Sequence, residues 1–218
     1  MIEHVYRRAA AAESIDAVIV ATDDARIAAA VENFGGSALL TSPSHPSATD
    51  RIAELTRALS SKLIVNVQGD EPLLDPAVID ATVRTMLDTP SLEMATPARP
   101  IRPDEFTSPH VVKVVTDRQG FALYFSRTPI PYGRNESSLD LARAHIGLYV
   151  YRRDTLLKLA ALPPAPLERA ERLEQLRALE HGIRIKVVDT TYESLGVDTA
   201  EDLERVRNLY RTAVREPT

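Results

Sequence analysis

The stretch LIVNVQGDEP, residues 63–72, decides the fold more than any other part of the chain. Its apolar first half predicts a buried strand over 63–68. A glycine and two adjacent acids, Asp70 and Glu71, follow at once, and a plain loop needs no such cluster. In open α/β sheets, ligands bind beyond the carboxyl ends of the strands. We therefore expect ligand chemistry, such as the handling of a metal-bound anion, directly after this strand.

Strands and helices alternate around this stretch through the first part of the chain. Short apolar runs predict strands at 16–24, 38–42 and 63–68. Helical periodicity and capping residues predict helices at 2–12, 24–36, 47–61 and 75–88. This alternation argues for a parallel sheet with helices on both faces. The polar residues that end the three strands then lie at one edge of the sheet, where a site is expected.

The second half of the chain has a different character. Residues 110–127 form two apolar runs around a turn with Gly120, which predicts a hairpin. A strand is expected at 145–152, and residues 128–144 before it read as a polar loop. The remaining expected elements are helices at 153–162 and 167–182, a strand at 183–189 and a helix at 199–214. We treat residues 1–218 as a single domain, because there is no internal repeat.

Composition limits the classes of function. The 218 residues carry 26 basic and 31 acidic side chains, a formal net charge of -5, which argues against nucleic acid as the main partner. No cysteine is present, so disulfides, a thiol nucleophile and thiolate metal sites are excluded. No stretch approaches the length of a membrane span, and the first residues lack the apolar core of a signal peptide. The expectation is a cytoplasmic protein without a membrane partner.

Two carboxylates are candidates for metal binding. Asp70 follows a strand, and Asp198 lies in the motif LGVDTAED just before the last helix. Mg²⁺ takes one or two protein carboxylates and completes its octahedron with water and substrate oxygens. The alternative is that Asp70 makes a turn and Asp198 precedes a helix cap, which is the commoner situation for each acid alone.

Several other polar residues are candidates for ligand contacts. Arg51 and Arg127 could clamp a carboxylate or phosphate, although a surface ion pair is the simpler reading of each. Lys113 lies in an apolar strand, so its ammonium needs a partner or an opening to water. His145 begins a strand and is either a ligand or a structural histidine. The five histidines lack zinc-site spacing, and the common glycine-rich phosphate loops do not occur.

Five motifs in order carry a resemblance to a known family. They are VNVQGDEP (65–72), VVKVV with ALYFSR and PIP (111–131), HIGLYVYR (145–152), PAPLERAERLEQLRALEHG (164–182) and GVDTAEDLERVR (196–207). Together they closely resemble the 3-deoxy-manno-octulosonate cytidylyltransferases, from Ile2 to about Arg207. The ALYFSR and LEQLR motifs separate this family from the sialic-acid cytidylyltransferases.

The resemblance implies a fold and a reaction. The fold is an α/β, Rossmann-like nucleotidyltransferase of the nucleotide-diphospho-sugar transferase type, a mixed sheet flanked by helices. A smaller lobe, approximately residues 110–150, would bind sugar and form a homodimer. The implied reaction joins CTP and 3-deoxy-manno-octulosonate (Kdo) with Mg²⁺, giving CMP-Kdo for lipopolysaccharide synthesis and pyrophosphate.

The resemblance also implies roles for particular residues. Asp70 and Asp198 would hold Mg²⁺ between the nucleotide phosphate and the sugar, with Gln68 beside them. Arg51 would help to recognise the cytidine. The sugar pocket would be lined by Arg127, His145, Glu174 and Gln175.

This chain departs from the family pattern at two places. Ala48 stands where the family loop usually has glycine. Family members also begin with a strand and an arginine- and lysine-bearing phosphate loop, roughly thirty residues ahead of Met1. We expect a start codon assigned too late, and an unpaired gap in the sheet that lowers stability and activity. Two alternatives stay open: the same chemistry on an 8-amino-Kdo or another sugar acid, or an inactive truncated paralogue that binds a partner.

Overall fold

The computed structural model describes residues 1–45, 47–134, 136–193, 195–197 and 199–213. The chain begins with the elements α1 (Ile2–Ala10), β1 (Val20–Thr22), α2 (Ala25–Asn33) and β2 (Ala38–Leu40). Asp24 caps α2 by accepting a hydrogen bond from the Arg26 amide at 2.8 Å. All four elements confirm the sequence prediction in type, but both strands are shorter than predicted.

The next three elements also agree with the prediction. They are α3 (Ala48–Thr56), β3 (Leu63–Asn66) and α4 (Pro76–Asp88). The Ser47 hydroxyl caps α3 through the Asp50 amide, and the Asp75 carboxylate caps α4 through the Ala77 amide. Ala48 is the first helical residue of α3, so its backbone needs no left-handed conformation.

One strand was not predicted. Strand β4 (Met94–Pro100) has the sequence MATPARP, which lacks the apolar pattern of a buried strand and contains two prolines. Six of its seven residues are nevertheless buried, because β4 has neighbours on both sides and helices over both faces. Its place in the sheet depends on segments far away in the sequence.

The middle of the chain holds α5 (Pro103–Phe106), β5 (Lys113–Thr116), β6 (Ala122–Ser126), the 3₁₀ helix η1 (Glu136–Leu141), β7 (Arg143–His145) and β8 (Tyr149–Arg152). The hairpin prediction is confirmed, since β5 and β6 pair antiparallel. The strand expected at 145–152 is interrupted. β7 and β8 run in the same direction along β4, and a tight turn at Gly147, where the Leu148 amide donates to the Ile146 carbonyl at 2.7 Å, separates them. The expected loop before it contains η1.

The last elements are α6 (Arg153–Ala161), α7 (Pro166–Glu171), α8 (Gln175–Glu180), β9 (Ile185–Asp189) and α9 (Ala200–Ala213). The single helix predicted at 167–182 is wrong, because Arg172 has a left-handed backbone with φ of 53° and ends α7. The break reorients α8 so that Gln175 and Arg177 are buried.

The main sheet is mixed and not parallel as the alternation predicted. Its strand order is β3-β8-β4-β7-β5-β6, with β9 also paired to β4. Strand β8 inserts antiparallel between β3 and β4, and β4 with β9 is the parallel pair of this sheet. The family resemblance, which implied a mixed sheet, therefore described the topology better than the local pattern did.

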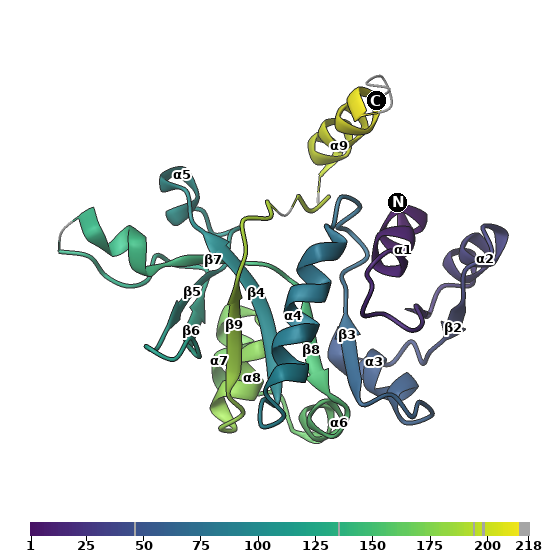
Figure 1. The fold of residues 1–218 in the computed structure, drawn as a ribbon, viewed down its shortest axis with the longest axis horizontal. Helices are drawn as coiled ribbons and strands as arrows, with labels where there is room; N and C mark the ends of the chain where they lie inside the picture. Colours follow the sequence, from purple (N-terminus) through teal and green to yellow (C-terminus); the bar gives the residue numbers. More distant parts are fainter. Residues whose placement is uncertain (46, 135, 194, 198, 214–218) are drawn as a thin grey trace.

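Helices cover both faces of the main sheet, as Figure 1 shows. On one face, α4 packs with α1 over Ala95, Leu148 and Val150. On the other face, α3, α6 and α8 pack over a second cluster that includes Met94, Phe125 and Tyr151. Residues 110–150 belong to the same sheet, and their role as a separate lobe stays a prediction.

The expected gap in the sheet is present. Within the described residues, β1 pairs only with β2, and these two strands form a separate parallel sheet. A cavity of about 720 Å³ lies between them and the main sheet, and both β1 and β3 line it. Helices α1 and α2 and strand β2 lie at one side of the molecule, beyond β3 (Figure 1).

Candidate active site

The carboxyl end of β3 carries a polar cluster. Asn66 is the last residue of the strand, and Gln68, Asp70 and Glu71 follow it. Gly147 lies directly against this cluster: a Cβ atom there would be 3.4 Å from Gln68 Cγ and 4.0 Å from Glu71 Oε1. The turn between β7 and β8 thus forms a wall of the site, at van der Waals distance from Gln68.

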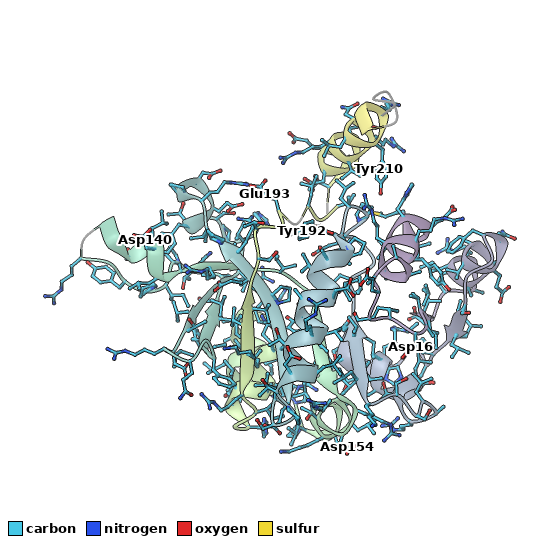
Figure 2. The ribbon with its side chains drawn as sticks, in the orientation of Figure 1. Asp16, Asp140, Asp154, Tyr192, Glu193 and Tyr210 are labelled. Atoms are coloured by element: carbon cyan, nitrogen blue, oxygen red, sulfur yellow. The ribbon has the colours of Figure 1, made fainter. Side chains whose placement is uncertain are left out.

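A distant segment meets Asp70. The Val197 amide donates to the Asp70 carbonyl at 2.9 Å. Helix α9 lies beside the same segment, since the Tyr210 hydroxyl donates to the Pro72 carbonyl at 2.6 Å, and Figure 2 shows Tyr210 on the side of α9 nearest α4. Asp198 itself lies outside the described residues, but its neighbour Val197 brings the segment GVDT to Asp70.

The donor set at this edge fits a hard divalent cation. Carboxylate oxygens are the protein ligands that Mg²⁺ prefers, and one or two of them suffice. Asp70 is half-buried, so part of its side chain remains accessible. Among the described residues, no three His, Cys, Asp or Glu side chains gather as a metal cluster. Asp70 with Asp198 stays the predicted pair, and Asp198 lies outside the described residues.

Arg51 connects the small sheet to α3. Its guanidinium donates to Thr41 Oγ1 at 2.5 Å and to Asp23 Oδ2 at 3.0 Å. Asp23 follows β1 and Thr41 follows β2, so Arg51 joins both strand ends. The ends of β1 and β2 are therefore joined. Arg51 also lines the same cavity as Gln68, which follows β3 of the other sheet.

Glu174 lies at the start of α3. Its carboxylate accepts hydrogen bonds from Ala48 N at 3.3 Å, Thr49 N at 3.2 Å and Thr49 Oγ1 at 2.6 Å. Glu174 therefore holds the turn that leads to Arg51. Gln175 is buried, and among the described residues its Nε2 atom has no hydrogen-bond partner.

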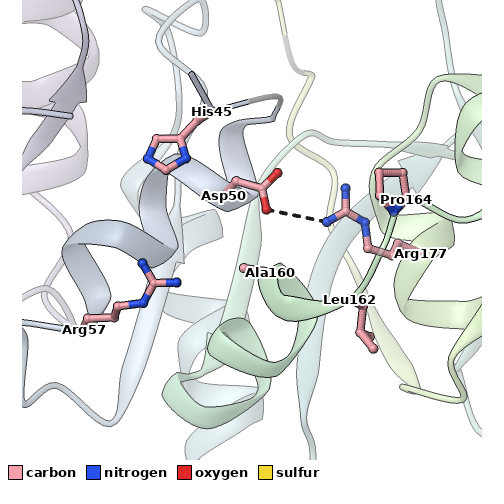
Figure 3. Close-up of a pocket in the computed structure, with 7 residues that line it drawn as sticks. All are labelled: His45, Asp50, Arg57, Ala160, Leu162, Pro164 and Arg177. Atoms are coloured by element: carbon pink, nitrogen blue, oxygen red, sulfur yellow. Dashed lines mark ion pairs between the residues drawn. The ribbon is translucent and has the colours of Figure 1, made fainter. Parts of the chain in front are cut away.

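A buried ion pair that the sequence did not reveal supports the same helix. Arg177 is 3% exposed, and its guanidinium donates to both carboxylate oxygens of Glu168 at 2.8 and 2.6 Å. It also lies 3.7 Å from Asp50 of α3 (Figure 3), and both residues line a pocket of about 290 Å³. Arg177 ends the LEQLR motif, so the motif carries a packing role.

His145 lies in an aromatic surrounding. Its ring is 5.0 Å from Phe125 and 5.4 Å from Tyr149 between centroids. Burial lowers the pKa of His145 to about 3, so the imidazole is neutral at neutral pH. Burial raises the pKa of Tyr149 and Tyr151, and the nearby Glu174 carboxylate raises both further. His145 and Glu174 thus flank the same pair of tyrosines.

Arg127 and Lys113 lie at the hairpin of β5 and β6, where backbone carbonyls hold both side chains. Arg127 donates to the Glu171 carbonyl at 3.0 Å and to the Pro109 carbonyl at 3.1 Å. Lys113 is fully buried and donates to three backbone carbonyls, of Ser108, Val111 and Arg127. Burial lowers the pKa of Lys113, and these three acceptors satisfy its ammonium. Lys113 therefore shapes the backbone around Arg127.

The chain has close relatives among known proteins. The family model described as Cytidylyltransferase matches residues 1–185. The 3-deoxy-manno-octulosonate cytidylyltransferase of Solibacter usitatus is 53% identical over 215 residues, which are 98% of this chain and 85% of that protein. The chain belongs to the 3-deoxy-manno-octulosonate cytidylyltransferase family. The family member of Anaeromyxobacter sp. is 54% identical and covers 99% of this chain and 88% of its own length.

Solved structures agree with this membership. A CMP:2-keto-3-deoxy-manno-octonic acid synthetase complexed with CTP has a TM-score of 0.92 and 41% identity, over 97% of this chain and 88% of that one. A 4-diphosphocytidyl-2C-methyl-D-erythritol synthase of Anaerococcus prevotii has a TM-score of 0.64 at 15% identity, which shows the fold alone. The nucleotidyltransferase fold implied by the sequence motifs is thereby confirmed.

Proposed function

We propose that this protein transfers CMP from CTP to Kdo, giving CMP-Kdo and pyrophosphate. The anomeric hydroxyl oxygen of Kdo bonds to the α-phosphorus, the bond from that phosphorus to the bridging oxygen breaks, and pyrophosphate leaves while the hydroxyl proton passes to solvent. The hydrogen bond from Val197 to Asp70 is the main support, because it joins the two acid-bearing segments at one strand end.

Asp70 and Asp198 would hold Mg²⁺, which supplies neutralisation of phosphate charge and polarisation of the phosphorus under attack. The protein's own residues would position the two substrates. Gln68 is packed against Gly147, and the turn there limits where a substrate can lie. Arg51 lies at the ends of β1 and β2, where its guanidinium would face the nucleotide. Positioning and charge neutralisation provide most of the rate enhancement in phosphoryl transfer.

The acceptor would lie along the aromatic surface near His145. The neutral imidazole, Glu174 and the unpartnered Gln175 amide would contact its hydroxyl and carboxylate groups. Arg127 would lie at the edge of this pocket. Two backbone carbonyls already accept hydrogen bonds from its guanidinium and would hold it there. An 8-amino-Kdo or another sugar acid would react by the same chemistry, so the acceptor is to be tested directly.

The cellular setting is also part of the proposal. We propose a cytoplasmic homodimer that serves lipopolysaccharide synthesis. No helix in the described part of the chain is long and apolar enough to span a membrane. Exposed apolar side chains on the 110–150 region support a partner surface there: Leu123 is 62% exposed, Tyr132 90% and Leu141 65%.

The decisive experiment is pyrophosphate release by the purified protein with CTP, Mg²⁺ and each of several sugar acids. We expect release with Kdo, and little with UTP or with other acids. Asp70→Asn should slow release about 10²- to 10³-fold while the circular dichroism spectrum is kept. Asp154→Asn is the matched control, because Asp154 follows Arg152, which pairs with Leu63 at the end of β3 away from Asp70. Its side chain is 95% exposed at the lower edge of the molecule in Figure 2. Absence of release by the folded wild type, or full activity of Asp70→Asn, would overturn the proposal.

A further inference from the structure

Thr96 of β4 is fully buried and lies beneath the turn between β7 and β8. Its hydroxyl oxygen is 2.7 Å from the Leu148 carbonyl oxygen, 3.3 Å from the Ile146 carbonyl oxygen and 2.9 Å from His145 Nε2. Thr96 therefore contacts both the backbone of the turn and the imidazole ring. The pattern of apolar residues gave no sign of β4, so sequence analysis missed this residue.

The geometry fixes the direction of the hydrogen bond between Thr96 and His145. A threonine hydroxyl has one proton to donate and two lone pairs that accept. The proton belongs on the line to Leu148, because two oxygens 2.7 Å apart without a proton between them would repel. The Thr96 oxygen must then accept from His145, so the proton of the neutral imidazole is on Nε2.

The other ring nitrogen is consequently an acceptor. A neutral imidazole with its proton on Nε2 has a lone pair on Nδ1. Among the described residues, Nδ1 has no hydrogen-bond partner. It is also not one of the buried polar atoms that lack a partner. Nδ1 is therefore exposed, and water or a ligand can reach it. Phe125 and Tyr149 pack against the ring and hold its orientation.

We propose that Thr96 is a positioning residue that holds His145 as the Nε2–H tautomer, so that Nδ1 accepts a hydrogen bond from a hydroxyl group of the sugar acid. The tautomer follows from the protein alone, whereas the contact to the sugar rests on the proposed function. A site built in this way favours a hydroxyl donor and disfavours a group that can only accept.

The test combines a spectroscopic and a kinetic measurement. ¹⁵N chemical shifts of labelled histidine in the wild-type protein should show Nε2 protonated and Nδ1 unprotonated for His145, assigned by its loss in His145→Gln. Thr96→Val removes the hydroxyl at nearly constant volume, and should lose the single tautomer. Its KM for Kdo should rise about tenfold, the equivalent of one hydrogen bond, while kcat and the KM for CTP change less than about twofold.

Two further variants make the result specific. Thr96→Ser keeps the hydroxyl and should restore both the tautomer and the KM for Kdo. Thr82→Val is the matched control, because Thr82 is also fully buried and its hydroxyl donates to the Val78 carbonyl of its own helix. A proton on Nδ1 in the wild type would overturn the proposal even if Thr96→Val does not fold. An unchanged tautomer and KM in Thr96→Val would also overturn it. If the wild type turns over no sugar acid, the proposed function fails, and the ¹⁵N shifts still decide the tautomer.

Discussion

The two sheets of this protein differ in the length of their strands and in how well they are packed. The main sheet has helices on both faces, and β3 pairs with β8 over four residues. The small sheet has two strands of three residues, and Leu39 and Leu40 of β2 are 47% and 60% exposed. The strand end that carries Asp70 belongs to the first sheet, and the two strand ends joined by Arg51 belong to the second.

This difference assigns separate tasks to the two sides of the site. His145 ends β7, and Gln68 and Asp70 directly follow β3 of the well-packed main sheet, which would suit the precise placement of reacting groups. Arg51 depends on the ends of β1 and β2, and both Arg51 and β1 line a cavity of about 720 Å³ on the side of β3. Helix α3 joins the two sides, and the Glu168, Glu174 and Arg177 contacts fix its start to the main body.

The largest expected difference concerns the strand-end acids of the two sheets. Asp70→Asn should lower kcat about 10²- to 10³-fold, because a charge that acts on the reacting phosphate is lost. Asp23→Asn should mainly raise the KM for CTP, by about tenfold or less, because Asp23 acts through Arg51. Steady-state kinetics of both variants checks this. Equal losses of kcat would contradict the division of tasks.

Core truncation should also separate the two sheets. Leu156→Ala removes a side chain that is 0% exposed and should lower the free energy of unfolding by about 2–5 kcal/mol. Leu40→Ala removes a side chain that is 60% exposed and should change it by less than about 0.5 kcal/mol. Urea denaturation followed by circular dichroism measures both. If Leu40→Ala lowered the free energy of unfolding nearly as much as Leu156→Ala, the side chains of β2 would be buried by other residues in solution.

Hydrogen exchange compares the sheets without any mutation. The amides of Val20 and Thr41, bonded to the Ser37 and Thr22 carbonyls, should exchange about tenfold or more faster than amides between β3 and β8. The reason is that few apolar contacts hold the small sheet closed. Mass spectrometry of peptic fragments resolves the two regions. Equal protection would mean that the cavity does not weaken β1.

The last expected effect is the pH dependence that His145 gives to the main sheet. Its pKa falls from 6.5 in the unfolded chain to about 3 on folding, so between these values the unfolded chain binds more protons. Stability is therefore complete above pH 6.5 and declines as the pH falls, by up to about 1.4 kcal/mol per pH unit from this group. His145→Gln should decline less steeply in urea titrations from pH 7 to pH 4. If the free energy of unfolding fell equally with pH in the wild type and in His145→Gln, the neutral imidazole would be contradicted.

Local patterns predicted the helices well and the sheet order poorly. The caps Asp24, Ser47 and Asp75 are visible in the sequence and function as expected. Strand β4 was missed because Pro97 and Pro100 are unusual in a buried strand. The prediction of a parallel sheet failed because β8, from a segment far along the chain, pairs antiparallel with β3 and β4. No local signal marks the left-handed residue Arg172 that separates α7 from α8.

The site was predicted in part. The motif order located Asp70, and the bond from Val197 supports the expected meeting with the segment of Asp198. The contacts of Glu174 with Thr49, and of Arg127 with backbone carbonyls, could not be read from the sequence, because they depend on how α8 and the hairpin pack. Thr96 and Arg177 were missed for the same reason.

The most direct test of the account is the identity of the product. A ³¹P NMR spectrum of CTP, Kdo, Mg²⁺ and the purified protein should show the triphosphate signals decay while one phosphodiester signal and a pyrophosphate signal grow in equal amounts. That result would establish CMP transfer to the sugar acid. A spectrum in which CTP persists beside folded protein, or yields CMP without a phosphodiester, would contradict it.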